Sequence, residues 1–367
     1  MNFQNHIPNF KFLVIIAITA LGPKTWADST AVAEPATTEV KMSAPLPEKP
    51  KGSVTFKVFA EWYDDFSKGT DKESGFDMTR AYLGYKYDFT EYLSSTVILD
   101  AGRSNEIVSA VYDTTARRVN TTTDARYKAF LKIASVKYVE LVPRTTLEAG
   151  LVGSNQFSTQ EKFWGYRYVY KSLMDQNGYG AAADLGAKVN VKLSDVLGLS
   201  VEALNGDGFT KPQDVHGFYK LSGALDLKLP MGLSGYGYYD WSPQRGLEAQ
   251  SNIAGFLGYE MKEMFRVGAE LDYQIANKGV DSNDLTGISA YAAYYVTKQL
   301  EVFARFDLLQ SKDDWNIAGT DGQTLIGGIQ YTPAKGFKLA ADYQGFTPAA
   351  SGTDPQPKFK VNLEFSL

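Results

Sequence analysis

The chain has 367 residues, of which 44% are hydrophobic and 13% aromatic, and it contains no cysteine. This composition is typical of a folded protein and excludes a disordered or collagen-like chain. The lack of cysteine excludes disulfide bonds, thiolate metal sites and a cysteine nucleophile. A formal net charge of -5 leaves no basic surface for nucleic acid, so we expect no nucleic-acid partner.

The amino-terminal segment has the pattern of a secretory signal. Lys11 precedes an apolar run over 12–22, and 25–27 has the small-x-small pattern of a cleavage site. The run is shorter than the roughly 20 apolar residues of a spanning helix, which disfavours a membrane anchor. We therefore expect residues 1–27 to be a signal peptide. Residues 28–51 are rich in Ala, Thr, Pro and Glu without any period, which predicts a disordered lead-in.

From Val54 to Leu367 the dominant pattern is an alternation of apolar and polar residues with a period of two, which is typical of β-strands. We predict strands near 53–63, 78–88, 92–102, 127–138, 145–153, 180–193, 198–205, 217–229, 232–241, 251–261, 265–276, 286–297, 299–309, 323–332, 336–345 and 357–367. Short connections alternate with long ones along this series. That order is typical of an up-and-down meander whose two ends lie on the side of the short turns.

The distribution of charge within these strands indicates what each face contacts. Nearly all charged residues share the polar face, where Lys and Arg are about as frequent as Asp and Glu. Lys137 is the exception, and its place at a turn end would let its amine reach the membrane interface. A charge on a lipid face costs roughly 2–4 kcal/mol at the midplane, which explains an uncharged face. We therefore predict an all-β fold over 52–367, a transmembrane antiparallel up-and-down β-barrel of 16 strands.

Aromatic residues gather at both ends of the predicted strands. Tyr87, Phe89 and Tyr259 lie beside short turns, whereas Trp62 and Trp241 lie toward the long loops. Two such bands match the interfacial girdles of an outer-membrane barrel. Strand propensity alone explains the number of these residues but explains their placement at the strand ends less easily.

Several segments resemble the phosphate-selective porin O/P-like family of bacterial outer-membrane porins. They are EKFWGYRYVYKSLMD at 161–175, YGAAADLGAKVNVKL at 179–193, VEALNGDGF at 201–209 and RAYLGYKYDFTEYLSSTVILDAG at 80–102. The resemblance covers roughly 76–245. It implies a sixteen-stranded, usually trimeric channel in the outer membrane, with outer-membrane lipid around it and a third loop folded inward. Leu367 departs from the aromatic residue that commonly ends such barrels, although Phe365 lies on the same face.

The segment between Gly153 and Tyr179 is the third long loop, and its composition predicts a constriction inside the pore. A lumen formed by sixteen strands is too wide for wall side chains to fill, and non-strand backbone is tolerated there when it lines the cavity. We expect aromatic anchors to hold the loop to the wall and charged residues to face the solute. The predicted anchors are Phe163, Trp164, Tyr166, Tyr168 and Tyr170, and the predicted solute-facing residues of the loop are Glu161, Lys162, Arg167 and Lys171. The alternative is a surface-binding or structural barrel, a receptor or adhesin whose third loop stays outside.

Basic residues of the wall predict a mild preference for anions. We expect Lys132, Lys188 and Arg305 at mid-height, with Arg80 and Lys128 above them. The competing interpretation is a solvated wall in which these cations pair with neighbouring carboxylates. In the family that the chain resembles, the phosphate preference depends on dense basic ladders, and we do not carry that preference over to this chain. The permeant species are therefore expected to be small hydrophilic solutes or ions.

An enzymatic function is poorly supported by the sequence. The expected mature chain has a single histidine, His216, and no serine can be assigned to it as a nucleophile. The run at 205–208, NGDG, resembles half of a calcium loop but lacks the later glutamate. We expect no catalytic site, no metal and no cofactor.

The processing of the amino terminus can be tested directly. We expect protein purified from the outer membrane to begin at Asp28, because Ala27 ends the cleavage pattern. Amino-terminal sequencing of that material checks this, and a first residue of Met1 would contradict it.

Overall fold

The computed structural model describes residues 51–68, 73–103, 107–113, 118–124, 126–213 and 217–367. The predicted signal peptide at 1–27 and the predicted lead-in at 28–51 lie outside these residues, apart from Lys51. His216 also lies outside them. Those three assignments therefore stay predictions.

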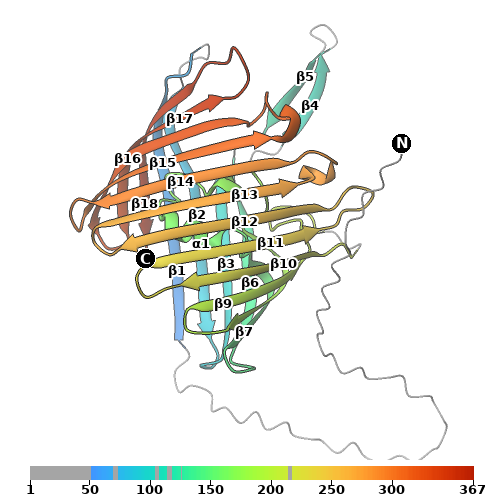
Figure 1. Ribbon diagram of the computed structural model, residues 1–367, viewed down its shortest axis with the longest axis vertical. Helices are drawn as coiled ribbons and strands as arrows, with labels where there is room; N and C mark the ends of the chain where they lie inside the picture. Colours follow the sequence, from blue (N-terminus) through green and yellow to red (C-terminus); the bar gives the residue numbers. More distant parts are fainter. Residues whose placement is uncertain (1–50, 69–72, 104–106, 114–117, 125, 214–216) are drawn as a thin grey trace, which may run out of the picture. The chain divides into compact units, whose positions relative to one another are not determined.

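Sixteen of the strands form a closed antiparallel barrel, which confirms the predicted fold (Figure 1). Each strand pairs with its neighbour along the barrel, and β1 closes the ring by pairing with β18. The barrel strands are β1 (Lys51–Asp65), β2 (Ser74–Asp88), β3 (Leu93–Arg103), β6 (Tyr127–Val139), β7 (Thr145–Gly153), β8 (Ala183–Lys192), β9 (Leu197–Leu204), β10 (Lys220–Lys228), β11 (Leu233–Ser242), β12 (Gln250–Met261), β13 (Phe265–Ile275), β14 (Leu285–Tyr295), β15 (Leu300–Ser311), β16 (Gly322–Ala334), β17 (Phe337–Pro348) and β18 (Gln356–Ser366).

Short and long connections alternate as the sequence predicts. The short turns are 89–92, 140–144, 193–196, 229–232, 262–264, 296–299 and 335–336. The first and last strands also start and end on this side, where the Leu367 amide donates to the Phe56 carbonyl. The long third loop, 154–182, therefore opens from the opposite, loop side of the barrel.

Burial in the barrel is inverted relative to a water-soluble protein. Apolar residues on the outward face are exposed, such as Leu257 with 64% of its surface accessible, whereas inward-facing Asp240 is fully buried. Glu202 and Asp342 are buried on the same inner face. A continuous uncharged outer surface is expected where hydrocarbon replaces water. The alternation in the sequence therefore separates a lipid-facing side from a lumen side.

A β-bulge at Lys132 corrects the prediction for Lys137. In the pairing of β3 with β6, Ile98 lies opposite Ile133 and Leu99 lies opposite Leu131, so Lys132 has no partner. The extra residue reverses the side on which later residues of β6 point. The Lys137 amine consequently lies 3.6 Å from the Glu148 carboxylate, which also accepts a hydrogen bond from the buried Ser135 hydroxyl. Lys137 therefore joins the lumen face and does not extend toward the membrane interface.

Short elements in the loops were not expected from the sequence. The third loop contains α1 (Ser158–Trp164) and α2 (Leu173–Gln176), and the second contains a separate hairpin of β4 (Ile107–Asp113) and β5 (Arg118–Thr123). Single turns of 3-10 helix, η1 (Asn277–Gly279) and η2 (Lys312–Asp314), occur in two further loops. Within the described part of the chain, no helix has the length and apolarity to cross a membrane.

The assignment of faces predicts opposite outcomes at two adjacent positions of β8. Val189 lies opposite Val201, whose side chain is half exposed on the outer face, whereas Asn190 lines a cavity of the lumen. We expect Val189→Arg to lower the free energy of folding into lipid by about 2–4 kcal/mol, because it places a charge in hydrocarbon. Asn190→Arg serves as the matched control, and we expect it to fold like the wild type. Urea titration of folding into vesicles measures both, and equal losses would contradict the assigned faces.

Candidate pore constriction

The third loop turns back sharply after α1. Gly165 caps the helix with a φ of 76°, a left-handed conformation that glycine adopts without strain, and its amide donates to the Glu161 carbonyl. A Cβ at this position would lie 3.0 Å from the Arg266 guanidinium. The turn directs the next residues along the wall, where Tyr166 contacts β15 and Tyr168 contacts β16. In Figure 1 α1 lies between the blue strands and the yellow to orange strands.

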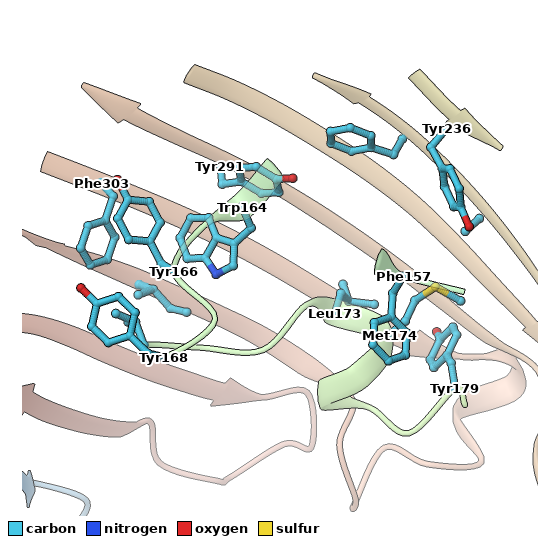
Figure 2. Packing of buried hydrophobic residues seen from close by; sticks show 14 of the residues in the cluster. Phe157, Trp164, Tyr166, Tyr168, Leu173, Met174, Tyr179, Tyr236, Tyr291 and Phe303 are labelled. Carbon is cyan, nitrogen blue, oxygen red and sulfur yellow. The ribbon is translucent and has the colours of Figure 1, made fainter. Parts of the chain in front are cut away.

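The first half of the loop packs against the lumen face of β14 and β15 through aromatic rings (Figure 2). The Tyr166 ring stacks on Phe303 with centroids 4.4 Å apart, and its hydroxyl donates to the Glu301 carboxylate at 2.6 Å. Trp164 is almost fully buried and lies 5.1 Å from the Tyr291 ring. Buried aromatic rings contribute large apolar areas, and such ring pairs add about 0.5–1.5 kcal/mol each. This side of the loop is therefore firmly attached to the wall.

The remaining predicted anchors also contact inward-facing residues or the loop itself. Phe163 lies 5.1 Å from the Phe256 ring of β12, and the Tyr168 hydroxyl donates to Gln330 of β16 at 2.8 Å. The Tyr170 carbonyl accepts a hydrogen bond from the Trp164 indole at 2.9 Å, which closes the turn on itself. All five aromatic residues thus lie on the side of the loop that faces β12–β16.

The second half of the loop is held by polar contacts. The Tyr179 carbonyl accepts hydrogen bonds at 3.1 Å from the side-chain amides of Gln156 and Asn252. The buried Lys220 amine donates to the Gln156 side chain at 2.7 Å and pairs with Asp240 at 2.9 Å. Buried amides and charges need such partners, so this network fixes where the chain re-enters the wall.

Arg305 lies beneath the loop, which corrects its predicted place among the solute-facing residues. Only 1% of its surface is exposed, and its guanidinium makes two hydrogen bonds to Asp307 at 2.8 and 2.9 Å. The guanidinium also lies 5.1 Å from the centre of the Trp164 ring and 5.6 Å from that of Tyr170. A cation covered in this way does not face the solute. It stabilises the surface where the loop contacts β14 and β15, which we call the seat of the loop.

The charged residues of the loop point away from this seat. Arg167 joins the two helices by pairing with Glu161 at 2.8 Å and with Asp175 at 2.9 Å, and Lys171 lies 3.9 Å from Asp175. Burial raises the pKa of Glu161, against the effect of Arg167, and lowers the pKa of Lys171. Lys162 is exposed and forms no ion pair with any described residue.

The open part of the lumen lies between the charged side of the loop and the wall of β1–β6. A loop-side cavity of about 710 Å³ is lined by Arg80, Asp100, Lys132, Arg167 and residues of the outer loops. A turn-side cavity of about 380 Å³ follows, and Lys132 and Arg167 line both. The two cavities therefore adjoin at these two side chains, and we call this place the narrow region of the path. Asp100 is buried beside it, paired with Arg80 at 3.2 Å and with Lys132 at 3.1 Å.

Two predicted wall residues lie apart from this narrow region. Lys188 donates to the Gly153 carbonyl at 2.7 Å and lies 3.6 Å from Glu148, and Lys128 pairs with Asp124 at 3.2 Å. Several residues that line the turn-side cavity were not predicted as part of the site, among them Lys57, Phe59, Tyr82 and Lys338. Lys57 and Lys338 lie on the polar face of their strands, but only the placement of the loop shows that they face the open path. In the described part of the chain, no group of three or more His, Asp or Glu residues is placed to hold a metal ion.

The chain is similar in structure to bacterial outer-membrane porins. The outer membrane channel DcaP of Acinetobacter baumannii aligns with 87% of this chain and 97% of its own, at 13% identity and a TM-score of 0.63. Salmonella typhi OmpF in complex with daunomycin aligns with 86% of this chain and 98% of its own, at 12% identity and a TM-score of 0.61. An anion-selective porin from Comamonas acidovorans aligns with 87% of this chain and 100% of its own, at 12% identity and a TM-score of 0.60. At these identities the likeness establishes a shared porin fold. No family model matches the sequence, and no curated protein is detectably similar to it.

The packing of the loop predicts a local effect of removing one ring. We expect Trp164→Ala to destabilise the seat of the loop by about 3–5 kcal/mol, because the ring is buried among Tyr166, Tyr291 and Phe303. Hydrogen exchange of 158–171 should then accelerate while the barrel strands stay protected. Trp241→Ala, which removes an exposed ring on the outer face, is the control. Equal exchange of the loop in both variants would show that the ring does not hold it.

Proposed function

We propose that this protein is an outer-membrane porin, a water-filled channel through which small hydrophilic solutes and ions diffuse passively, with a preference for anions. Three observations support the channel: the closed barrel with an uncharged outer face, the third loop seated inside it, and the cavities that remain beside the loop. The shared porin fold agrees with this function. It also favours outer-membrane lipid as the surroundings of the barrel.

The observation that carries the anion preference is the unequal burial of charge. Among the described residues, the buried carboxylates are Asp100, Asp124, Glu148, Asp184, Glu202, Asp240, Glu270, Asp272, Asp284, Asp307, Asp321, Asp342 and Glu364, whereas the only buried cations are Lys220 and Arg305. Acidic and basic residues are about equally frequent in the wall, so this asymmetry leaves cations nearest to the solute. Fixed cations along a pore attract anions and repel cations.

The linings of the cavities have the same asymmetry. The loop-side cavity, the turn-side cavity and a third cavity of about 370 Å³ are lined by Lys57, Arg80, Lys132, Lys162, Arg167, Lys211, Lys228, Arg245, Arg266, Lys278 and Lys338, against Asp100, Glu161, Asp175, Asp207, Asp226, Glu260 and Glu364. Of the residues predicted from the sequence, we retain Arg80, Lys132, Lys162, Arg167 and Lys171 as the cations that set selectivity. We also retain Glu161, because its carboxylate orients Arg167.

Membership of the phosphate-selective subfamily stays a proposal that rests on the sequence resemblance alone. The same holds for a homotrimer, which the resemblance implies. The alternative of a receptor or adhesin with an external third loop is less well supported, because the loop makes its contacts with inward-facing residues. We also propose that the protein has no catalytic activity, since its polar groups line an open path and support no reaction.

Selectivity can be tested by reversing two cations of the loop. Lys162→Glu with Lys171→Glu leaves Arg167 and its two ion pairs intact. We expect the ratio of anion to cation permeability to fall by about fivefold or more, because even one unit charge about 4 Å from an ion contributes roughly 1 kcal/mol in water. The reversal potential of purified channels in planar bilayers under a salt gradient measures this ratio.

The matched control changes the net charge equally and lies far from the loop. Lys298→Glu with Lys335→Glu reverses two exposed lysines at short turns, and we expect the wild-type reversal potential. Equal shifts in both double variants would contradict a selective region at the loop. The absence of any conductance in the wild type would contradict the channel itself. Closure of single channels in three equal steps would support the trimer.

A further inference from the structure

An apolar patch lies inside the lumen where a water-filled pore needs none. Ile98 of β3 lies opposite Ile133 of β6, and both side chains line the turn-side cavity. The bulge at Lys132 produces this pair, because it turns Ile133 to the same side as Lys132. Tyr82 extends the patch, and the buried Phe59 ring supports it with a centroid distance of 5.9 Å. Apolar surface kept exposed in an aqueous cavity often marks a binding site.

Cations surround this patch. Lys57, Lys132, Lys162, Arg167 and Lys338 line the same cavity, and its two carboxylates, Glu161 and Glu364, are already paired. Glu364 lies 3.5 Å from Lys338 and 4.0 Å from Lys57. Lys162 forms no ion pair with a described residue, so its charge is available to a solute. The cavity thus combines a free cation with a hydrophobic wall.

The chemistry of these cations disfavours an inorganic oxyanion as the preferred ligand. Arginine binds phosphate through two parallel donors, whereas lysine binds it only as a point charge. Arg167 is the only arginine among the described residues that line the turn-side cavity, and Glu161 and Asp175 already engage its guanidinium. The lysines attract a carboxylate and an inorganic oxyanion alike, but a bare oxyanion gains nothing from Ile98 and Ile133, whereas an organic anion can bury its body there.

We propose that the turn-side cavity is a binding site for monocarboxylates with an aromatic or aliphatic body. The carboxylate pairs with Lys162, and the body rests on Ile98, Ile133 and Tyr82. A volume of about 380 Å³ lies within the range of small-molecule sites. This inference rests on the proposed function, since the site lies on the anion path, and it adds the class of solute that the path favours.

The inference is tested by blocking the chloride current of wild-type channels with a series of anions. Acetate, butyrate, hexanoate and benzoate are added in turn, with phosphate for comparison. We expect the half-blocking concentration to fall along the series, by about tenfold between acetate and benzoate, because the longer bodies bury more apolar area. Equal block by acetate and benzoate, or stronger block by phosphate, would overturn the proposal. In either case the chloride current itself would remain, and with it the proposed function.

Variants separate the two halves of the site. Ile98→Thr with Ile133→Thr keeps β-branched residues in both strands, and we expect benzoate block to weaken about tenfold while acetate block stays unchanged. Lys162→Gln should weaken the block by both anions. Leu247→Thr removes an exposed apolar side chain from the loop-side cavity and is the matched control, expected to behave as the wild type. A loss of benzoate block in Leu247→Thr equal to that in the isoleucine variant would contradict the assigned site.

Discussion

The attachment of the third loop to one half of the lumen wall is the interaction on which the rest of this structure depends. A ring of sixteen strands encloses more space than wall side chains can fill, so its interior stays wide unless another segment enters it. Tyr166, Trp164 and Tyr168 bind the loop to β14–β16, and the network around the Tyr179 carbonyl binds it to β10–β12. The aromatic contacts hold the middle of the loop, and the polar network joins its start at Gln156 to its end at Tyr179. Neither end is free to swing out without losing buried rings or buried hydrogen bonds.

The same attachment decides which charges a solute meets. Burying Arg305 and Asp307 together behind Trp164 removes a pair of charges from the path, and many further carboxylates of the wall are buried as well. Burying a charged side chain is costly unless an opposite charge pairs with it. In the part of the wall that the loop covers, Lys220 is such a partner for Asp240. The cations opposite the loop stay beside water. Position relative to the loop, and not the number of charges, therefore sets the sign of the field in the open path.

The sequence predicts the barrel well because one local rule operates in every strand. Each residue that faces lipid must be uncharged, so the alternation alone gives the number of strands, their faces and the order of turns and loops. The bulge at Lys132 shifts the alternation of β6 by one residue. A prediction that assumes a constant period of two therefore assigns Lys137 to the lipid face instead of the lumen face. Charge itself carried the clue, because Lys137 was the single exception on an otherwise uncharged face.

The site is less predictable for a different reason. The composition of 161–171 indicates which side chains can pack against the barrel wall and which can face the solute. It does not show which strands the loop contacts. Arg305 and Lys338 both lie on the polar face of their strands, so the sequence does not distinguish them. In the structure, Arg305 lies under Trp164, whereas Lys338 lines the open turn-side cavity. Long-range packing makes that distinction, since residues more than 130 positions apart come into contact.

The bulge at Lys132 connects the geometry of the wall to the chemistry of the path. Without the extra residue, β6 would turn either Lys132 or Ile133 to the lumen, but not both. With it, the Lys132 amine reaches Asp100 at 3.1 Å while Ile133 meets Ile98 across the strand pair. A cation and an apolar patch thus become neighbours on a surface where strict alternation would separate them. Bulges are frequent beside functional sites for this reason, because they re-aim side chains that a regular strand would point away.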